Sequence, residues 1–281
     1  MPLTSHGVAI RNPAVEPRQA QDLQGTTSDS IPETDVLPGT DVLPAETKPV
    51  PLANGIPLRI MPLGASITFG VESSDGNGYR NDVRKALVAG GNPVNMVGSQ
   101  RGGTMKDNEN EGYPGLRIGQ VKDQALPALK EMKPNVVLIN LGTNDAGQDF
   151  FVDSAKDRMG ELIGLIFNRT DKTATVVLST LLPNKNETTA KNVDIINEGY
   201  AKLVERFRKE KKRIVLADMG GPDGPKLSTD FADETHPNDL GYAKMAKIWL
   251  KAIREASKQG LLHRAVKVTG VADDGDSEAK S

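Results

Sequence analysis

The strongest constraint on the fold is an alternation, beginning near Leu58, between short apolar runs and longer amphipathic segments. Strands that are apolar on both faces belong in a sheet covered by helices on both sides, and intervening helices connect such strands in parallel. The expected strands are LRIMPL (58–63), VNMVG (94–98), NVVLINLG (135–142), ATVVLSTLL (174–182) and RIVLADM (213–219), and the expected helices span residues 79–89, 118–132, 154–167, 193–210 and 240–257.

This alternation predicts a single α/β domain over residues 55–262, a three-layer α/β/α sandwich with a five-stranded parallel sheet. Residues 1–54 are rich in proline, threonine, aspartate and glutamine and contain the repeat TDVLPGTDVLP, so we expect a disordered tail there. Residues 263–281, which end in VADDGDSEAKS, are expected to form a polar, acidic C-terminal tail.

Composition argues against several classes of function. The chain has no cysteine, which excludes disulfides, thiolate metal sites and a cysteine nucleophile. A net charge of −2 gives no broad reason to expect nucleic acid as a partner. No apolar stretch reaches the roughly 20 residues of a membrane span. The N-terminus also lacks an export signal, so the cytoplasm is the default expectation, with secretion if the sequence is a truncated form.

Chemistry is expected in the loops that follow the strands, because sites in parallel sheets collect at the carboxyl ends of the strands. The first expected strand is followed by GASIT, which contains Ser66. The third is followed by GTND (142–145), and the fifth by a long loop containing DETHP (233–237). All three loops should therefore open at the same edge of the sheet.

A serine hydroxyl needs a base to take its proton as it attacks, and histidine is the usual base. Of the three histidines, only His236 lies in a strand-end loop, and Asp233 precedes it by three residues. This spacing lets the carboxylate accept a hydrogen bond from the imidazole and fix its tautomer. Each motif alone also has an ordinary explanation: GTND as a turn, and Asp233 or Thr235 as the cap of a helix that Pro237 begins.

The ordered set GASIT, GYPG, GTND and DETH resembles the four blocks of the SGNH hydrolases, the GDSL-type esterase superfamily, over about residues 58–252. Within it, the segments SSDGNGYR, DNENEGYPG and THPNDLGYAKMAKIW resemble carbohydrate esterases such as the family 3 acetyl xylan esterases. The resemblance implies a flavodoxin-like fold and ester hydrolysis through an acyl-serine, with no metal or cofactor. It implies Ser66 as nucleophile, completed by Asp233 and His236, and an oxyanion hole formed by Ser66 N–H, Gly115 N–H and the Asn144 side chain.

Two residues depart from the family pattern. Ala65 stands where the family usually has an aspartate before the serine, and Leu116 stands where the carbohydrate-esterase branch commonly has a tryptophan. The single tryptophan, Trp249, falls in a helical pattern that predicts burial. The acidic segment DNENE (107–111) lacks the spacing of a calcium-binding EF-hand loop, so we expect a solvated loop there.

The leading hypothesis is a monomeric serine esterase that removes a short acyl group, acetyl above all, from a small-molecule or oligosaccharide ester. One alternative is an acyltransferase or a lipase-like esterase that acts on a natural product or lipid. The non-enzymatic alternative, motivated by Ala65 and Leu116, is a degenerate esterase domain that serves as a binding module.

Overall fold

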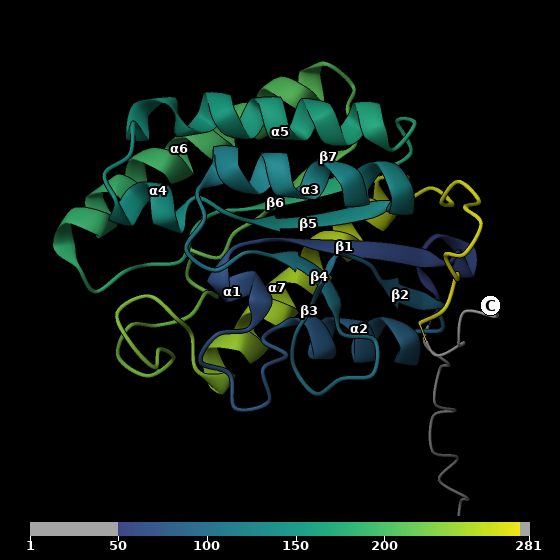
Figure 1. Cartoon of the computed structure of the whole chain (residues 1–281), viewed down its shortest axis with the longest axis horizontal. Helices are drawn as coiled ribbons and strands as arrows, with labels where there is room; N and C mark the ends of the chain where they lie inside the picture. Colours follow the sequence, from purple (N-terminus) through teal and green to yellow (C-terminus); the bar gives the residue numbers. More distant parts are fainter. Residues whose placement is uncertain (1–49, 276–281) are drawn as a thin grey trace, which may run out of the picture. The chain divides into compact units, whose positions relative to one another are not determined.

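The computed structural model describes residues 50–275, and its fold is a parallel sheet between two layers of helices (Figure 1). Within this range the strands run in the spatial order β3-β4-β1-β5-β6-β7, and β2 also pairs with β1. All pairings are parallel except that of β3 with β4. The strands are β1 (Leu58–Gly64), β2 (Val94–Met96), β3 (Gln100–Arg101), β4 (Glu109–Gly112), β5 (Val136–Asn140), β6 (Thr175–Ser179) and β7 (Ile214–Ala217).

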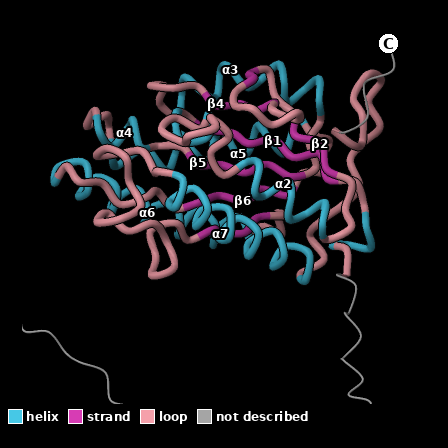
Figure 2. Tube along the Cα trace, turned by 90° about the horizontal axis from the view of Figure 1, so that it is seen from below, coloured by secondary structure: helices cyan, strands magenta, loops and turns pink. Residues whose placement is uncertain are grey.

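The helices cover both faces of this sheet. Buried side chains of α3 (Ile118–Met132), α5 (Ala155–Arg169) and α6 (Glu187–Lys209) form one core cluster with the sheet. Those of α2 (Arg80–Ala89) and α7 (Asp239–Lys258) form a second cluster on the opposite face. Figure 2 shows β4, β1, β5 and β6 lying side by side in that order. The three-layer α/β/α fold and the five expected parallel strands are thus confirmed.

The short strands β3 and β4 were not predicted, and the expectation of a solvated loop over residues 107–111 is wrong. Asn110 and Glu111 are fully buried in β4. Glu111 accepts hydrogen bonds from the Ser99 backbone N–H and from the Tyr113 hydroxyl at 2.6 Å. Burial raises the pKa of the Glu111 carboxyl, and these two donors oppose that effect only in part. A polar strand of this kind has no apolar run by which the sequence could reveal it.

The packed part of the chain extends beyond both expected domain boundaries. The predicted disordered segment lies outside the described residues except for residues 50–54, where Leu52 N–H donates to Asn92 and Ala53 N–H donates to Ser257. At the other end, residues 263–275 of the predicted acidic tail contact the domain. The Val266 and Ala272 carbonyls accept hydrogen bonds from buried side chains of β1 and β2, and Gly275 N–H donates to Val94.

The register of the sheet brings the carboxyl ends of three strands level with one another. Gly64 pairs with Gly112 of β4 on one side and with Asn140 of β5 on the other. A Cβ atom at Gly64 would lie 2.2 Å from the Thr68 Oγ1 atom and 2.3 Å from the Asn140 carbonyl oxygen, so only glycine allows this close approach. The chain turns directly after Gly64 into the short helix α1 (Ser66–Phe69).

Candidate active site

Ser66 lies at the point where β1 ends and α1 begins. Ala65 precedes the helix in an irregular backbone conformation, with φ −118° and ψ −138°, and Ser66 is the first helical residue. The Phe69 N–H donates to the Ala65 carbonyl and the Gly70 N–H donates to the Ser66 carbonyl. These bonds fix the helix, so that the partly exposed Ser66 hydroxyl stands at the carboxyl edge of the sheet.

The Ser66 hydroxyl, His236 and Asp233 form a hydrogen-bonded line. The distance from Ser66 Oγ to His236 Nε2 is 2.8 Å, and that from His236 Nδ1 to Asp233 Oδ2 is 2.7 Å. His236 thus contacts a serine that lies 170 residues earlier in the sequence, and Asp233 of the same loop contacts the other side of the imidazole. This is the arrangement in which an imidazole can take the proton of an attacking hydroxyl.

Asp233 is held by its own loop as well as by the imidazole. Its Oδ1 atom accepts hydrogen bonds from the backbone N–H groups of Thr235 at 2.7 Å and His236 at 2.6 Å. Partial burial tends to raise the pKa of the Asp233 carboxyl, but the hydrogen bonds from the His236 side chain and from the two backbone groups outweigh it and lower the pKa. The carboxyl group therefore stays ionised at neutral pH.

The loop around His236 is closed at its base by backbone contacts. The Ala232 N–H donates to the His236 carbonyl at 3.0 Å, and the Asn238 N–H donates to the Asp230 carbonyl at 3.0 Å. The expectation that Pro237 begins the following helix is wrong: α7 begins at Asp239, and its cap is Asn238, which accepts a hydrogen bond from the Gly241 N–H. Asp233 and Thr235 are therefore not the caps of this helix, and the carboxylate is directed to His236.

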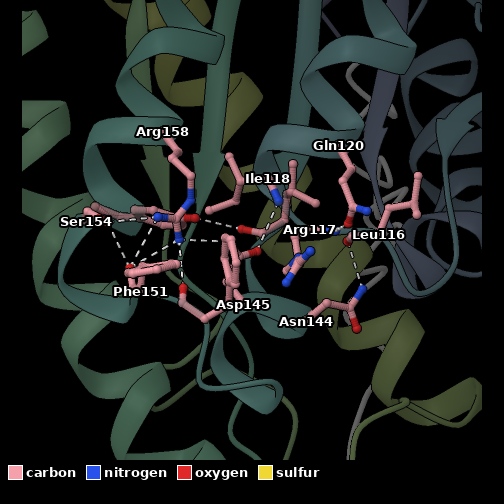
Figure 3. A network of polar contacts seen from close by, with 12 residues as sticks. Leu116, Arg117, Ile118, Gln120, Asn144, Asp145, Phe151, Ser154 and Arg158 are labelled. Carbon is pink, nitrogen blue, oxygen red and sulfur yellow. Dashed lines mark hydrogen bonds and ion pairs between the residues drawn. The ribbon is translucent and has the colours of Figure 1, made fainter.

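Two further segments lie at the same edge of the sheet, where the Tyr113 N–H donates to the Gly64 carbonyl. Residues 113–116 form a turn in which the Leu116 N–H donates to the Tyr113 carbonyl, with Pro114 and Gly115 at the central positions. Gly115 has φ +80°, as the third residue of a type II turn requires. Asn144 lies in the short helix α4 (Thr143–Gly147), and its Nδ2 atom donates to the Leu116 carbonyl at 2.9 Å (Figure 3).

Ser66 helps to line a small hollow of about 10 Å³, a volume close to that needed by a single water molecule. It is lined by Ala65, Ser66, Ile67, Asn140, Leu141, Gly142, Thr143 and Asn144. The structure thus brings the loops after β1 and β5 together at one point. Gly115 is not among the lining residues and belongs to the neighbouring turn.

Comparison with known proteins agrees with this geometry. The model of the GDSL-like lipase/acylhydrolase family matches residues 63–244. The chain belongs to this family. It is 30% identical over 224 residues to a multidomain esterase of Ruminococcus flavefaciens, a match that covers 70% of this chain and 28% of that protein. The chain thus spans little more than a quarter of the curated relative that it matches.

Solved structures show the same fold. A family 3 carbohydrate esterase of Clostridium thermocellum superposes with a TM-score of 0.65 at 24% identity, covering 73% of this chain and 98% of that one. A family 3 carbohydrate esterase from Talaromyces cellulolyticus superposes with a TM-score of 0.60 at 20% identity, covering 72% of this chain and 99% of that one. The fold expected from the GDSL-type motifs is therefore confirmed.

The two departures from the family pattern both lie at the edge of the core. Ala65 is 8% exposed and packs with side chains of the α3 and α5 face, and Leu116 packs partly buried against the same cluster. Neither position offers an aromatic surface to a sugar ring. Trp249 is fully buried, as predicted, with its ring centroid 5.5 Å from that of Tyr79.

Several residues that support the GDSL-type site were not identified from the sequence. Tyr200 of α6 is fully buried and donates its hydroxyl to the Leu141 carbonyl at 2.8 Å, directly before the GTND segment. Asn184 donates to the Thr235 hydroxyl at 3.0 Å and so braces the His236 loop from the loop after β6. Each of these contacts comes from a single polar residue in a helix or loop, and no spacing rule in the sequence distinguishes such a residue from an exposed one.

The described residues form neither a metal-binding cluster nor a membrane-spanning helix. Among residues 50–275, no group of three or more histidine, aspartate or glutamate side chains is placed to hold a metal ion. In the same range, every helix is too short or too polar to pass through a membrane.

Proposed function

We propose that the protein is a serine esterase that hydrolyses short-chain esters, acetyl esters above all, of a carbohydrate or another hydroxylated small molecule. The observation that carries this proposal is the line from Ser66 Oγ through His236 to Asp233, with both hydrogen bonds shorter than 3 Å. Membership of the GDSL-like lipase/acylhydrolase family supports acyl transfer as the reaction class.

The proposed reaction proceeds in two halves. Ser66 Oγ attacks the ester carbonyl carbon while its proton passes to His236 Nε2, which gives a tetrahedral intermediate with negative charge on the former carbonyl oxygen. The C–O bond to the alcohol then breaks, and the imidazolium returns the proton to the leaving alkoxide. Water repeats the sequence on the acyl-serine, with His236 again as base, and releases the carboxylic acid and free Ser66.

The oxyanion would be held by the Asn144 side chain together with the N–H groups of Ser66 and Gly115. Such donors, fixed before the reaction begins, each contribute about 3–4 kcal/mol to transition-state stabilisation. Asn144 is suited to this role because its amide is already held in place by the bond to the Leu116 carbonyl, which uses only one of its two N–H hydrogens. Asp233 stabilises the imidazolium and keeps Nδ1 protonated.

Two observations support a short acyl group and a carbohydrate alcohol. The hollow that Ser66 helps to line is about 10 Å³, which leaves no room in it for a long alkyl chain. Two of the solved structures with the same fold are family 3 carbohydrate esterases. An acyltransferase uses the same acyl-serine, so product analysis with and without an acceptor alcohol distinguishes the two reactions.

The decisive experiment compares hydrolysis of p-nitrophenyl acetate, butyrate and octanoate by the wild type and by Ser66→Ala. We expect the wild type to prefer acetate and the variant to lose nearly all activity. If Ser66→Ala hydrolyses acetate at the wild-type rate, the proposal is wrong. If the folded wild type hydrolyses no ester, including acetylated xylo-oligosaccharides, the binding-module alternative suggested by Ala65 is favoured.

A further inference from the structure

Asp145, the residue after Asn144, is fully buried and uses both carboxylate oxygens. Its Oδ2 atom accepts a hydrogen bond from the Ile118 backbone N–H at 3.0 Å, and its Oδ1 atom accepts one from Arg158 Nη2 at 2.9 Å. Figure 3 shows these contacts converging on Asp145 from α3 and α5. A buried carboxylate is stable only when such partners surround it.

The contacts of Asn144 and Asp145 join the same two segments at neighbouring points. Asn144 contacts the Leu116 carbonyl, and Asp145 contacts the N–H of Ile118, two residues further on. Two bonds from adjacent residues thus join α4 to the segment in which α3 begins. The orientation of the Asn144 amide therefore depends on the Asp145 carboxylate.

Arg158 extends this arrangement to the loop after α4. Its Nη2 atom also donates to the Phe150 carbonyl at 3.0 Å and to the Phe151 carbonyl at 3.3 Å. Phe151 has φ +41°, a conformation unusual for a residue other than glycine, which persists only where the surroundings enforce it. Arg158 thus bonds to Asp145 near the start of the segment 144–151 and to the Phe150 and Phe151 carbonyls at its end.

We propose that Asp145, held by Arg158, is a positioning residue that acts through Asn144 and keeps its amide directed at the oxyanion. This inference rests on the proposed function, because it assigns Asn144 to the oxyanion hole. The competing explanation is purely structural: a carboxylate near the first residues of α3 also stabilises that helix through its dipole. The two explanations differ in whether the effect of Asp145 on kcat depends on Asn144.

A double-mutant cycle with p-nitrophenyl acetate tests the inference, using Asn144→Ala, Asp145→Asn and the double variant. Asparagine at 145 preserves size but can accept from only one of the two donors, so its NH₂ group faces either Arg158 or the Ile118 N–H. We therefore expect kcat to fall about 10- to 100-fold with KM nearly unchanged, which is part of the 100- to 1,000-fold effect of removing an oxyanion donor. In the Asn144→Ala background we expect the same change to lower kcat by less than about threefold.

Asp107→Asn is the matched control. Asp107 is also a buried aspartate that accepts a hydrogen bond from an arginine, Arg84, and from a backbone N–H, that of Met96, but these partners belong to α2 and β2 rather than to the segments that hold Asn144. We expect both variants to melt at lower temperature than the wild type and only Asp145→Asn to lose kcat. Equal losses of kcat in the two variants overturn the inference.

Arg158→Lys provides a second variant if Asp145→Asn fails to fold. Lysine keeps the charge beside Asp145 but cannot contact the two carbonyls of Phe150 and Phe151 in the same geometry. We expect kcat to fall about three- to tenfold, again only when Asn144 is present. If Arg158→Lys lowers kcat by the same factor in the wild type and in the Asn144→Ala variant, the inference is overturned. Full activity of Ser66→Ala instead contradicts the proposed function itself.

Discussion

Replacement of Asp233 by asparagine should abolish most activity with little effect on stability. The backbone N–H groups of Thr235 and His236 require an acceptor at the position of Oδ1. The amide oxygen of Asp233→Asn therefore takes that position and turns its NH₂ group toward His236 Nδ1. A donor there stabilises the tautomer protonated on Nε2, which cannot accept the Ser66 proton. We expect kcat to fall about 10,000-fold, as in serine hydrolases whose triad tautomer is reversed.

The same substitution should hardly change the melting temperature. The Asp233 side chain is 47% exposed, so its pairing with His236 is screened by water and contributes about 1 kcal/mol at most. For a domain of this size that corresponds to a shift of about 2–4 °C. Steady-state hydrolysis of p-nitrophenyl acetate and thermal unfolding measure the two effects. Glu234→Gln, an equal charge change one residue away, is the control, and a loss of kcat below tenfold in Asp233→Asn would refute the reasoning.

Three further predictions follow from the site. Asn144→Ala should lower kcat about 100- to 1,000-fold with KM nearly unchanged, measured by steady-state kinetics with the acetate ester; an equal rise in KM would contradict a transition-state role. Tyr200→Phe leaves the buried Leu141 carbonyl without its donor and should lower the free energy of unfolding by about 1–3 kcal/mol in urea denaturation, whereas no loss would show that water replaces the hydroxyl. The pKa of Asp233 is lowered on folding, so its contribution to stability is present above the unfolded pKa and is lost as pH falls through the folded pKa. The difference in unfolding free energy between the wild type and Asp233→Asn should therefore shrink on acidification, and a difference that grows would contradict it.

The sheet could be predicted because five of its strands, β1, β2, β5, β6 and β7, fall in apolar runs, and the order of these runs in the sequence leaves few topologies. The polar strand β4 could not, because its buried Asn110 and Glu111 are compensated by partners that only the folded chain brings near. The start of α6 was missed for a related reason. Its first turn is polar and is stabilised by the cap Asn186, which accepts a hydrogen bond from Thr189, rather than by an apolar face.

The sequence could predict those parts of the candidate site that lie directly at the ends of strands. The end of β1 and the loop after β7 place Ser66 and His236 at one edge of the sheet, which the order of apolar runs already implied. The contacts of Asp145 with Ile118 and Arg158 depend on how α3, α4 and α5 pack against one another, and no short sequence pattern predicts that packing. Asp145 was visible in the sequence only as the last residue of GTND.

The central claim is that Ser66 carries the acyl group during turnover, and the most direct test is to trap that intermediate. The enzyme would be mixed with p-nitrophenyl acetate, quenched in acid within the first turnover, digested and analysed by mass spectrometry. We predict one acetyl group on the peptide that contains Ser66, and none in Ser66→Ala. An active enzyme whose acetyl group is found on another residue, or whose Ser66→Ala variant turns over at the wild-type rate, would contradict the account.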